Sequence, residues 1–368
     1  MRAPRDGAKI RSLDGLRAIS ILLVLTGHLN GTRNFGTFDL IAGDVAHLGV
    51  VIFFVISGFL ITSLLATEWE QSGRISLKLF YLRRALRIIP PSYAYLGVVA
   101  ALAAAGVIVL HPNDLLHCLT YTVNYAPDRS WYIGHLWSLS VEEQFYLLWP
   151  FAFVLAGPRK AIRIAGAVIL IGPLARFAMW FAFRGSPWQD LPTFPVVADS
   201  IAAGCVLGLC RDWLESKNWY LAVFRPFPSL SLLIAVLAIN RFMKFSAVNI
   251  LGSAVINLSL AILVHRSVYC WRDPVGRLLN LMPLAFCGVL SYSLYVWQQI
   301  FLNRDSGAWI NAFPQNLVLA IGAALASYFI LEKPLMSLRR RLHSTALFAQ
   351  AYRGAVPEHA APLPPSHL

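Results

Sequence analysis

LDGLRAISILLVLTGHLNG, residues 13–31, indicates the fold, because this apolar run is long enough for one membrane-crossing helix. It also carries Arg17 and His28, which stand eleven positions apart. At 3.6 residues per turn, eleven steps make almost three turns, so both side chains fall on one face, roughly 16 Å apart along the axis. If Arg17 marks the cytoplasmic rim, His28 lies near the middle of the bilayer. A titratable group at that depth is costly and therefore indicates a function.

The composition predicts a membrane protein built from helices. Hydrophobic residues make up 57% of the 368 residues and charged residues only 13%, whereas soluble domains carry about a quarter charged residues. We expect an all-α polytopic fold with about ten transmembrane helices, each near the usual length of about 20 residues. The expected spans are residues 13–34, 46–67, 88–110, 136–156, 163–183, 195–211, 228–244, 247–265, 284–303 and 311–332. Residues 1–341 would form one membrane core, followed by a disordered Ala- and Pro-rich tail, residues 342–368.

The positive charge follows the pattern of a membrane protein. With ten spans and a cytoplasmic N-terminus, 24 of the 31 Lys and Arg residues fall on cytoplasmic segments. Arg176 lies within a span, and the other six lie on outer segments: Arg33, Arg129, Arg184, Arg241, Lys244 and Arg304. This asymmetry is the positive-inside signal and predicts that both termini are cytoplasmic. The net charge of +13 is therefore explained by the membrane topology, with the lipid bilayer as the expected partner, and does not indicate nucleic-acid binding.

The sequence predicts no metal site. The five cysteines are scattered, and none of their spacings is typical of a zinc site or a disulfide framework. They are Cys118, Cys205, Cys210, Cys270 and Cys287. We interpret them as small buried residues.

A basic segment, SLKLFYLRRALRIIPP at residues 76–91, separates the second and third expected spans. Its mixed apolar and basic residues predict an interfacial helix on the cytoplasmic face, with the two prolines in the first turn of the next span. Arg83, Arg84 and Arg87 would then form a patch. Such a patch binds either anionic lipid or the phosphates of a nucleotide-like ligand, and by itself does not distinguish them.

The acidic pair Glu142–Glu143 lies in GHLWSLSVEEQFYLLWP, residues 134–150. Two adjacent carboxylates cannot share one helical face, so we expect one of them to point into a cavity and the other to pair, protonate or reach the interface. One interpretation is a structural polar contact. The other is catalytic, in which a carboxylate orients His28 or stabilises its protonated form.

The Arg17–His28 pair also allows two interpretations. Arg17 can be an ordinary membrane anchor and His28 an interhelical hydrogen-bonding residue. Alternatively, the pair brackets a coenzyme A thioester, whose phosphates lie at one end and whose acyl group lies at the other, joined by an arm of roughly 16 Å. His28 would then either take the proton from an attacking hydroxyl or accept the acyl group itself.

Three further polar residues lie in apolar segments. Arg176 and Asp199 are expected to compensate one another across neighbouring helices. Glu332 precedes Lys333–Pro334 and is expected to end the last span, because proline commonly follows a helix end.

Taken in order, several segments resemble the integral-membrane acyltransferase 3 family. They are SLDGLRAISILLVLTGH (12–28), GVVIFFVISGFLIT (49–62), FYLRRALRIIPP (80–91), HLWSLSVEEQFYLLWP (135–150), ADSIAAGCVLG (198–208), SYSLYVWQQ (291–299) and LEKP (331–334). Members O-acylate cell-surface sugars, lipopolysaccharide, exopolysaccharide and small molecules such as macrolides.

The resemblance implies a ten-helix core in a bacterial-type inner membrane that takes an acyl group from cytoplasmic acyl-CoA, with acetyl-CoA as the expected donor. Its essential positions would be Arg17, His28, Arg84 and Arg87, with a glutamate of the 135–150 segment. The expected acceptor is a carbohydrate or glycolipid. Some members carry a fused extracytoplasmic hydrolase-like domain; we expect none here, so that the membrane core would complete the transfer alone or with a partner.

One position departs from the family pattern. Members often have a histidine after the aromatic pair, whereas here Val296–Trp297 is followed by Gln298. Glutamine forms hydrogen bonds but cannot shuttle a proton, so we expect no obligatory base at this position. Two alternatives to a glycan acyltransferase stay open: an acyltransferase that acts on a small molecule such as a macrolide, and a transporter with a proton-relay histidine.

Overall fold

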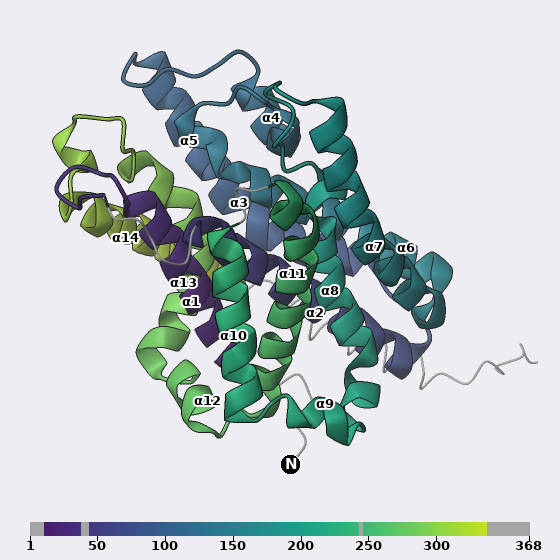
Figure 1. Ribbon diagram of the computed structural model, residues 1–368. Coiled ribbons are helices and arrows are strands. Elements are labelled where there is room, and N and C mark those ends of the chain that lie inside the picture. Colours follow the sequence, from purple (N-terminus) through teal and green to yellow (C-terminus); the bar gives the residue numbers. More distant parts are fainter. Residues whose placement is uncertain (1–10, 38–43, 243–245, 337–368) are drawn as a thin grey trace, which may run out of the picture.

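The computed structural model describes residues 11–37, 44–242 and 246–336, and every regular element within these ranges is helical (Figure 1). The α-helices are α1 (Arg11–Leu29), α2 (Val45–Ser72), α3 (Leu77–Ala104), α4 (Asp114–Leu119), α5 (Trp131–Gly134), α6 (Leu136–Ala156), α7 (Pro158–Ala182), α8 (Phe194–Glu215), α9 (Asn218–Ala222), α10 (Pro226–Arg241), α11 (Ser246–Tyr269), α12 (Pro274–Leu279), α13 (Met282–Phe301) and α14 (Gln315–Ser327). Two short 3₁₀ turns are η1 (Val123–Tyr125) and η2 (Trp309–Asn311), and α14 continues into a π-helical turn, η3 (Tyr328–Glu332).

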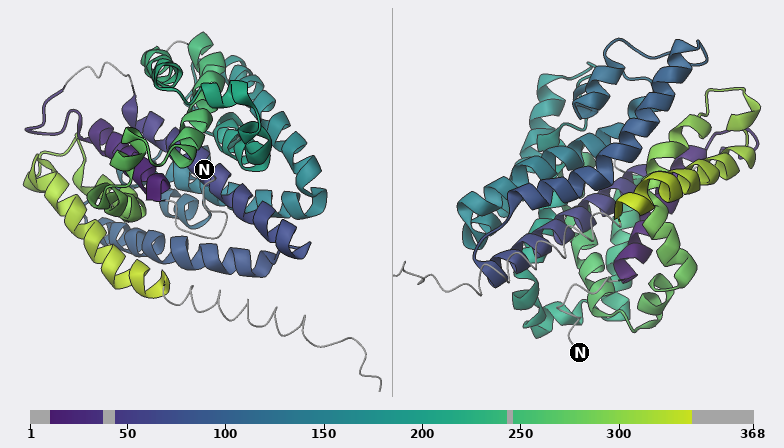
Figure 2. Two further views of the ribbon diagram at one scale, coloured as in Figure 1. Left: turned by 90° about the horizontal axis from the view of Figure 1, so that it is seen from below. Right: turned by 180° about the vertical axis from the view of Figure 1, so that it is seen from behind.

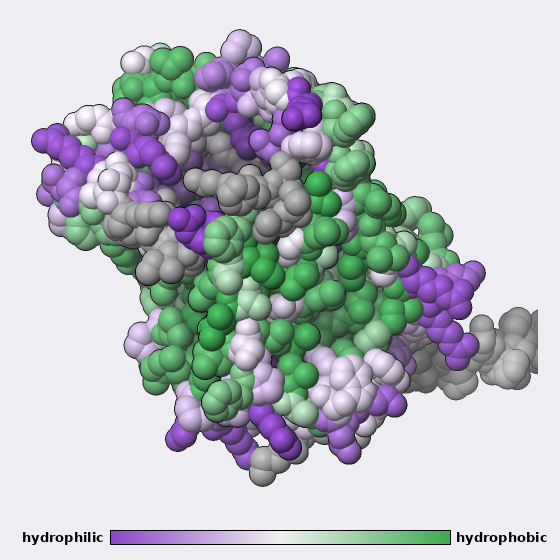
Figure 3. All heavy atoms as spheres, viewed as in Figure 1, coloured by the Kyte–Doolittle hydropathy of each residue, from purple (hydrophilic) through white to green (hydrophobic). Residues whose placement is uncertain are grey.

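The all-α polytopic fold is confirmed. Each of the ten expected spans overlaps one helix, and eight of these helices are long and apolar enough to cross a membrane. The eighth of these spans joins α14 to the turns after it, up to Met336. Of the other two helices, α10 has only 16 residues and α6 carries the glutamate pair. Figure 3 shows an apolar band on one face between hydrophilic regions at the two ends. The count of ten spans and the side of each terminus stay predictions, and the expected tail, residues 342–368, lies outside the described residues.

Helix α2 forms the centre of the bundle, with most of its apolar stretch buried. It packs against α1, α8 and α11, while α14 runs along the outside (Figure 2). The closest approach is between α2 and α8. A side chain at Gly58 would collide with the backbone of Ile201, and one at Gly204 with the backbone of Val55. Small residues permit such close helix contacts in membranes, where van der Waals packing holds helices together.

Replacing Gly204 with alanine is therefore expected to destabilise the bundle. The added methyl group has no room beside the Val55 carbonyl, and overpacking of this kind costs about 1–3 kcal/mol. Thermal unfolding of the purified protein in detergent would show a lower midpoint. Gly166→Ala in α7 is the matched control, because no atom of the described residues outside its own helix lies within 4 Å of a Cβ there. A Gly204→Ala midpoint equal to that of the control would contradict this account of the helix contact.

The ends of α1 and α2 follow from local sequence. Helix α1 stops at Leu29 before Gly31, whose φ of +86° suits glycine. Asp44 caps α2, since its carboxylate accepts a hydrogen bond from the backbone N–H of His47 at 2.9 Å. Arg17 lies in the second turn of α1 and His28 in its last turn. The expected position of His28 near the middle of the bilayer stays a prediction.

The basic segment 76–91 is not a separate interfacial helix. It forms the first half of α3, a continuous helix of 28 residues with Pro90 and Pro91 in its interior. A proline removes a backbone hydrogen bond, and neighbouring groups can compensate in a membrane helix. The carbonyls that lose their N–H donors are those of Leu86 and Arg87; at the next carbonyl, that of Ile88, the hydroxyls of Tyr292 (2.7 Å) and Ser92 (2.9 Å) both donate. The helix therefore continues through the prolines, and the contact from Tyr292 on α13 is one that the sequence pattern does not reveal.

The polar residues of the apolar segments have two different outcomes. The expected compensation of Arg176 by Asp199 is confirmed, because two guanidinium nitrogens donate to the two carboxylate oxygens at 3.2 and 2.7 Å. The expectation for Glu332 is wrong. The helix continues past it to Met336, and its buried carboxylate accepts a short hydrogen bond from Ser293 on α13. Such π-helical turns are often found at functional sites.

Candidate active site

A cavity of about 90 Å³ lies between α1, α2, α3, α6 and α13. Its polar lining comes from residues far apart in the sequence, whereas its apolar lining comes mostly from α2. The polar lining residues are Arg17, Ser57, Arg84, Arg87, Ser138, Glu142, Tyr146, Ser291, Tyr292 and Tyr295.

Three predicted cofactor-binding arginines meet in this cavity. Arg17 comes from α1, while Arg84 and Arg87 lie three positions apart on one face of α3. Arg17 forms an ion pair with Asp14 at 3.1 Å, and the Arg84 guanidinium lies 4.7 Å from the centre of the Tyr146 ring. Arg83, the third member of the expected patch, does not line the cavity. The arrangement concentrates positive charge and bidentate donors in one place, as phosphate binding requires.

The two glutamates of α6 point in different directions, as their adjacency requires. Glu142 lines the cavity, and its Oε2 atom accepts a hydrogen bond from the Tyr146 hydroxyl at 3.4 Å. The same hydroxyl forms a short hydrogen bond with Ser57 on α2. This set combines a carboxylate and two hydroxyls next to the arginines.

Glu143 lies outside the cavity. Its Oε1 atom is buried without a hydrogen-bond partner among the described residues. It lies close enough to Tyr121 to act on it electrostatically: burial raises the pKa of that phenol to about 12, and the Glu143 charge adds to the shift. Of the two predicted catalytic carboxylates, only Glu142 lines the cavity with the arginines. Glu143 still lies within electrostatic range of Arg84.

His28 does not line the cavity either. Its Nδ1 atom lies 2.9 Å from Oε1 of Gln298 on α13, and its ring meets the edge of Trp131 at 5.9 Å between centres. Its side chain is half-buried, in the last turn of α1. The two parts of the predicted site therefore lie at different levels of the bundle, with the arginines at one level and the imidazole nearer the far end of α1.

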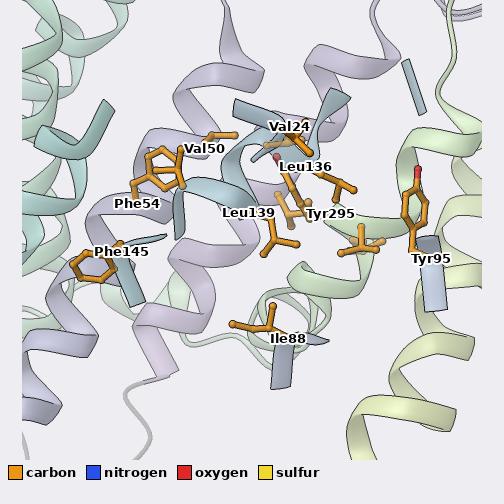
Figure 4. Close-up of a cluster of buried hydrophobic side chains, with 14 of the residues drawn as sticks. Val24, Val50, Phe54, Ile88, Tyr95, Leu136, Leu139, Phe145 and Tyr295 are labelled. Carbon is orange, nitrogen blue, oxygen red and sulfur yellow. The ribbon is translucent and has the colours of Figure 1, made fainter. Parts of the chain in front are cut away.

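Tyr295 lies between these two levels. It lines the cavity and is one turn before Gln298 on α13, about 4.5 Å along the axis. Its hydroxyl donates to the His135 carbonyl at 2.7 Å and lies 2.5 Å from the Ser138 hydroxyl. Figure 4 shows Tyr295 beside Leu136 and Leu139 in the buried apolar cluster. Tyr295 therefore lines the cavity one helical turn away from Gln298, the hydrogen-bond partner of His28.

Sequence reasoning missed the tyrosines and serines of the site. Tyr146 stands four residues after Glu142, a spacing that places both on one helical face, and this signal could have identified it. Ser57 is a polar residue in the apolar run of α2, a weaker signal. Nothing local to Tyr295 indicates its position between the cavity and His28, because this depends on how α13 packs against α6.

Several known proteins that this chain resembles are acyltransferases by name. A family model described as an acyltransferase domain matches residues 10–332. The chain is 28% identical to the peptidoglycan O-acetyltransferase OatA of Listeria monocytogenes, over 88% of this chain and 54% of that protein. It is 28% identical to the putative peptidoglycan O-acetyltransferase YrhL of Bacillus subtilis (92% and 57%). It is 30% identical to the putative O-acetyltransferase SACOL0978 of Staphylococcus aureus (88% and 57%).

These similarities have a limited extent. The chain spans a little over half the length of the relatives it matches. No solved structure matches it. The matched region nevertheless contains every predicted site residue, from Arg17 to Glu143.

Proposed function

This chain belongs to the acyltransferase 3 family, as its motifs predicted, and we propose that it is a membrane O-acyltransferase that moves an acetyl group from acetyl-CoA to a sugar hydroxyl. The donor would enter from the cytoplasm and the acceptor would be a cell-surface glycan, at a bacterial inner membrane. The names of the relatives support a cell-wall sugar, since two of them are named as peptidoglycan O-acetyltransferases or putative ones. The observation that carries the proposal is the cavity in which Arg17, Arg84, Arg87 and Glu142 meet.

In this proposal the three arginines hold the phosphates of the donor. Each guanidinium can form two charge-assisted hydrogen bonds to a phosphate group. The pantetheine arm would follow the cavity toward Tyr295, and movement of that side chain would let the thioester reach His28. The separation of Arg17 and His28 along α1, roughly 16 Å from the helix rise, suits this arm.

The chemical step balances with His28 as the base. The imidazole takes the proton of the acceptor hydroxyl while the hydroxyl oxygen attacks the thioester carbon. The C–S bond then breaks, the new C–O ester bond remains, and the imidazolium returns the proton to the leaving sulfur to give the free thiol. Alternatively, the acetyl group passes through the imidazole nitrogen before it reaches the acceptor. Glu142 would contribute from the cavity that holds the donor, where it is linked by hydrogen bonds to Tyr146 and, through Tyr146, to Ser57.

The test uses membrane vesicles that contain the protein and acetyl-labelled acetyl-CoA. The proposal expects release of free CoA together with transfer of label to an added acceptor. Separate reactions with peptidoglycan fragments, an exopolysaccharide and a macrolide would identify the acceptor class. A transporter would leave the label on CoA in all three reactions, and that result would exclude the proposed activity.

The two glutamates give a second test. Glu142→Gln is expected to lower the transfer rate at least tenfold more than Glu143→Gln, since only Glu142 faces the cavity; a positioned acid or base contributes about 10²–10⁴-fold. Both substitutions keep the size of the side chain, so the ratio of the two initial rates isolates the effect of position. Equal losses in the two variants would show that the cavity-facing carboxylate has no special role.

A further inference from the structure

Trp131 forms one hydrogen bond with the backbone of Gln299 and one with its side chain, and the second fixes the orientation of the side-chain amide. The Trp131 indole N–H donates to the backbone carbonyl of Gln299 at 2.9 Å. In return, Nε2 of Gln299 donates to the backbone carbonyl of Trp131 at 2.9 Å. A carbonyl oxygen only accepts, so the amide nitrogen of Gln299 must face Trp131. Its Oε1 atom therefore faces the other way.

This orientation determines that of Gln298. Oε1 of Gln299 accepts a hydrogen bond from Nε2 of Gln298 at 3.0 Å. Gln298 must then present its Oε1 atom to Nδ1 of His28, which lies 2.9 Å away. Both amides are buried, with 0% and 3% of their surface exposed, so solvent has little access to compete for these groups.

We propose that this amide relay, from Trp131 through Gln299 and Gln298, sets the tautomer of His28. An amide oxygen only accepts, so Nδ1 of His28 must carry the proton, and in the neutral imidazole Nε2 then has a free lone pair. Gln298 and Gln299 are positioning residues, which do for His28 what an orienting carboxylate does for a catalytic histidine in a Ser–His–Asp triad.

The inference deepens the proposed function and rests on it for its catalytic meaning. A base or acyl acceptor needs an unprotonated nitrogen directed at the reacting group, and the relay keeps Nε2 in that state. The glutamine at position 298 is also accounted for, because an amide cannot shuttle a proton but can fix the tautomer of its neighbour. Gln299 forms its side-chain hydrogen bonds with Gln298 and Trp131, so its effect on His28 is indirect.

The tautomer itself can be measured by NMR on protein labelled with ¹⁵N-histidine, with the His28 signal identified by its loss in His28→Ala. In the wild-type protein the proton should be on Nδ1. In Gln299→Met, whose side chain has nearly the length of glutamine but no amide, Gln298 is free to turn its NH₂ group toward His28. The Nδ1-protonated fraction should then fall. Asn257→Leu, which removes a buried amide bonded to Ser200, is the matched control and should leave the His28 signal unchanged.

Kinetics provide the second readout. Gln298→Met and Gln299→Met are expected to lower kcat by about 10–100-fold, the size usual for groups that orient a ligating histidine. KM for the donor should stay unchanged, because neither residue lines the cavity. Gln298→Glu keeps an acceptor oxygen for Nδ1 and should retain the wild-type tautomer.

The outcomes separate the relay from the proposed function. If Gln299→Met folds with the melting temperature of the control and retains the wild-type His28 tautomer, the relay is wrong. An unchanged kcat in both methionine variants would also overturn its catalytic meaning. If His28→Ala retains full activity while the tautomer responds as expected, the proposed function fails and the relay stands as a structural fact.

Discussion

Replacing His28 with alanine is expected to reduce acetyl transfer by about 10²–10⁴-fold, the usual contribution of a positioned general base. The loss would be larger if the imidazole itself carries the acetyl group. Two neighbours hold the His28 ring in place: Oε1 of Gln298 lies 2.9 Å from Nδ1, and the Trp131 ring packs edge-on at 5.9 Å between ring centres. The measurement is the rate of label transfer from acetyl-CoA to the acceptor in vesicles with matched amounts of protein.

His111→Ala is the matched control for this substitution. His111 is exposed, lies outside the helices and does not line the cavity, so its loss should leave the rate unchanged. Equal melting temperatures of the two variants in detergent would show that His28→Ala leaves the bundle intact. Wild-type turnover in His28→Ala would refute both the base and the acyl-carrier roles.

The combined substitution Arg84→Ala/Arg87→Ala is expected to produce the second largest effect, on donor binding. A hydrogen bond to a charged group contributes about 1.5–3 kcal/mol, which corresponds to about 10–100-fold in affinity for each arginine. KM for acetyl-CoA should therefore rise about 10²–10⁴-fold in the double variant. Arg17→Ala should raise it less, because Arg17 already pairs with Asp14.

Arg83→Ala is the matched control, since Arg83 is adjacent on α3 but does not line the cavity. Its effect on KM should be small beside that of the double variant. Initial rates over a range of acetyl-CoA concentrations distinguish the two. If all three arginine variants raise KM equally, or none does, the cavity is not the donor site, and a transporter without a coenzyme would explain tolerance of the double substitution.

The motifs predicted the participants of the site better than their arrangement. The spacing of Arg84 and Arg87 correctly places both on one face of α3, and the adjacency of Glu142 and Glu143 correctly requires them to diverge. Helix periodicity is local, so a single segment is enough to predict both features. Which glutamate enters the cavity depends on how α6 is rotated against α2 and α3, and no local pattern contains that information.

The expectations that failed did so for tertiary reasons. The prolines of the 76–91 segment predicted a helix start, but α3 continues through them, with hydroxyls from Ser92 and Tyr292 bound to the Ile88 carbonyl. Glu332 was expected to end a helix, yet Ser293 on α13 binds its buried carboxylate. In both places local propensity predicts a helix end, the helix continues, and a residue of α13 far away in the sequence forms a hydrogen bond there: Tyr292 with Ile88 and Ser293 with Glu332.

By itself, the sequence determined that this is a helical membrane protein and which family it belongs to, and it predicted the residues now proposed for the site. These properties depend on composition, apolar run length and ordered motifs, all of which are local. The tertiary structure alone decided that three arginines and one glutamate share a cavity, that Tyr295 lines it one turn before Gln298, and that hydrogen bonds connect Trp131, Gln299, Gln298 and His28. Each of these depends on contacts between α1, α3, α6 and α13, whose relative rotation is set by packing across the whole bundle.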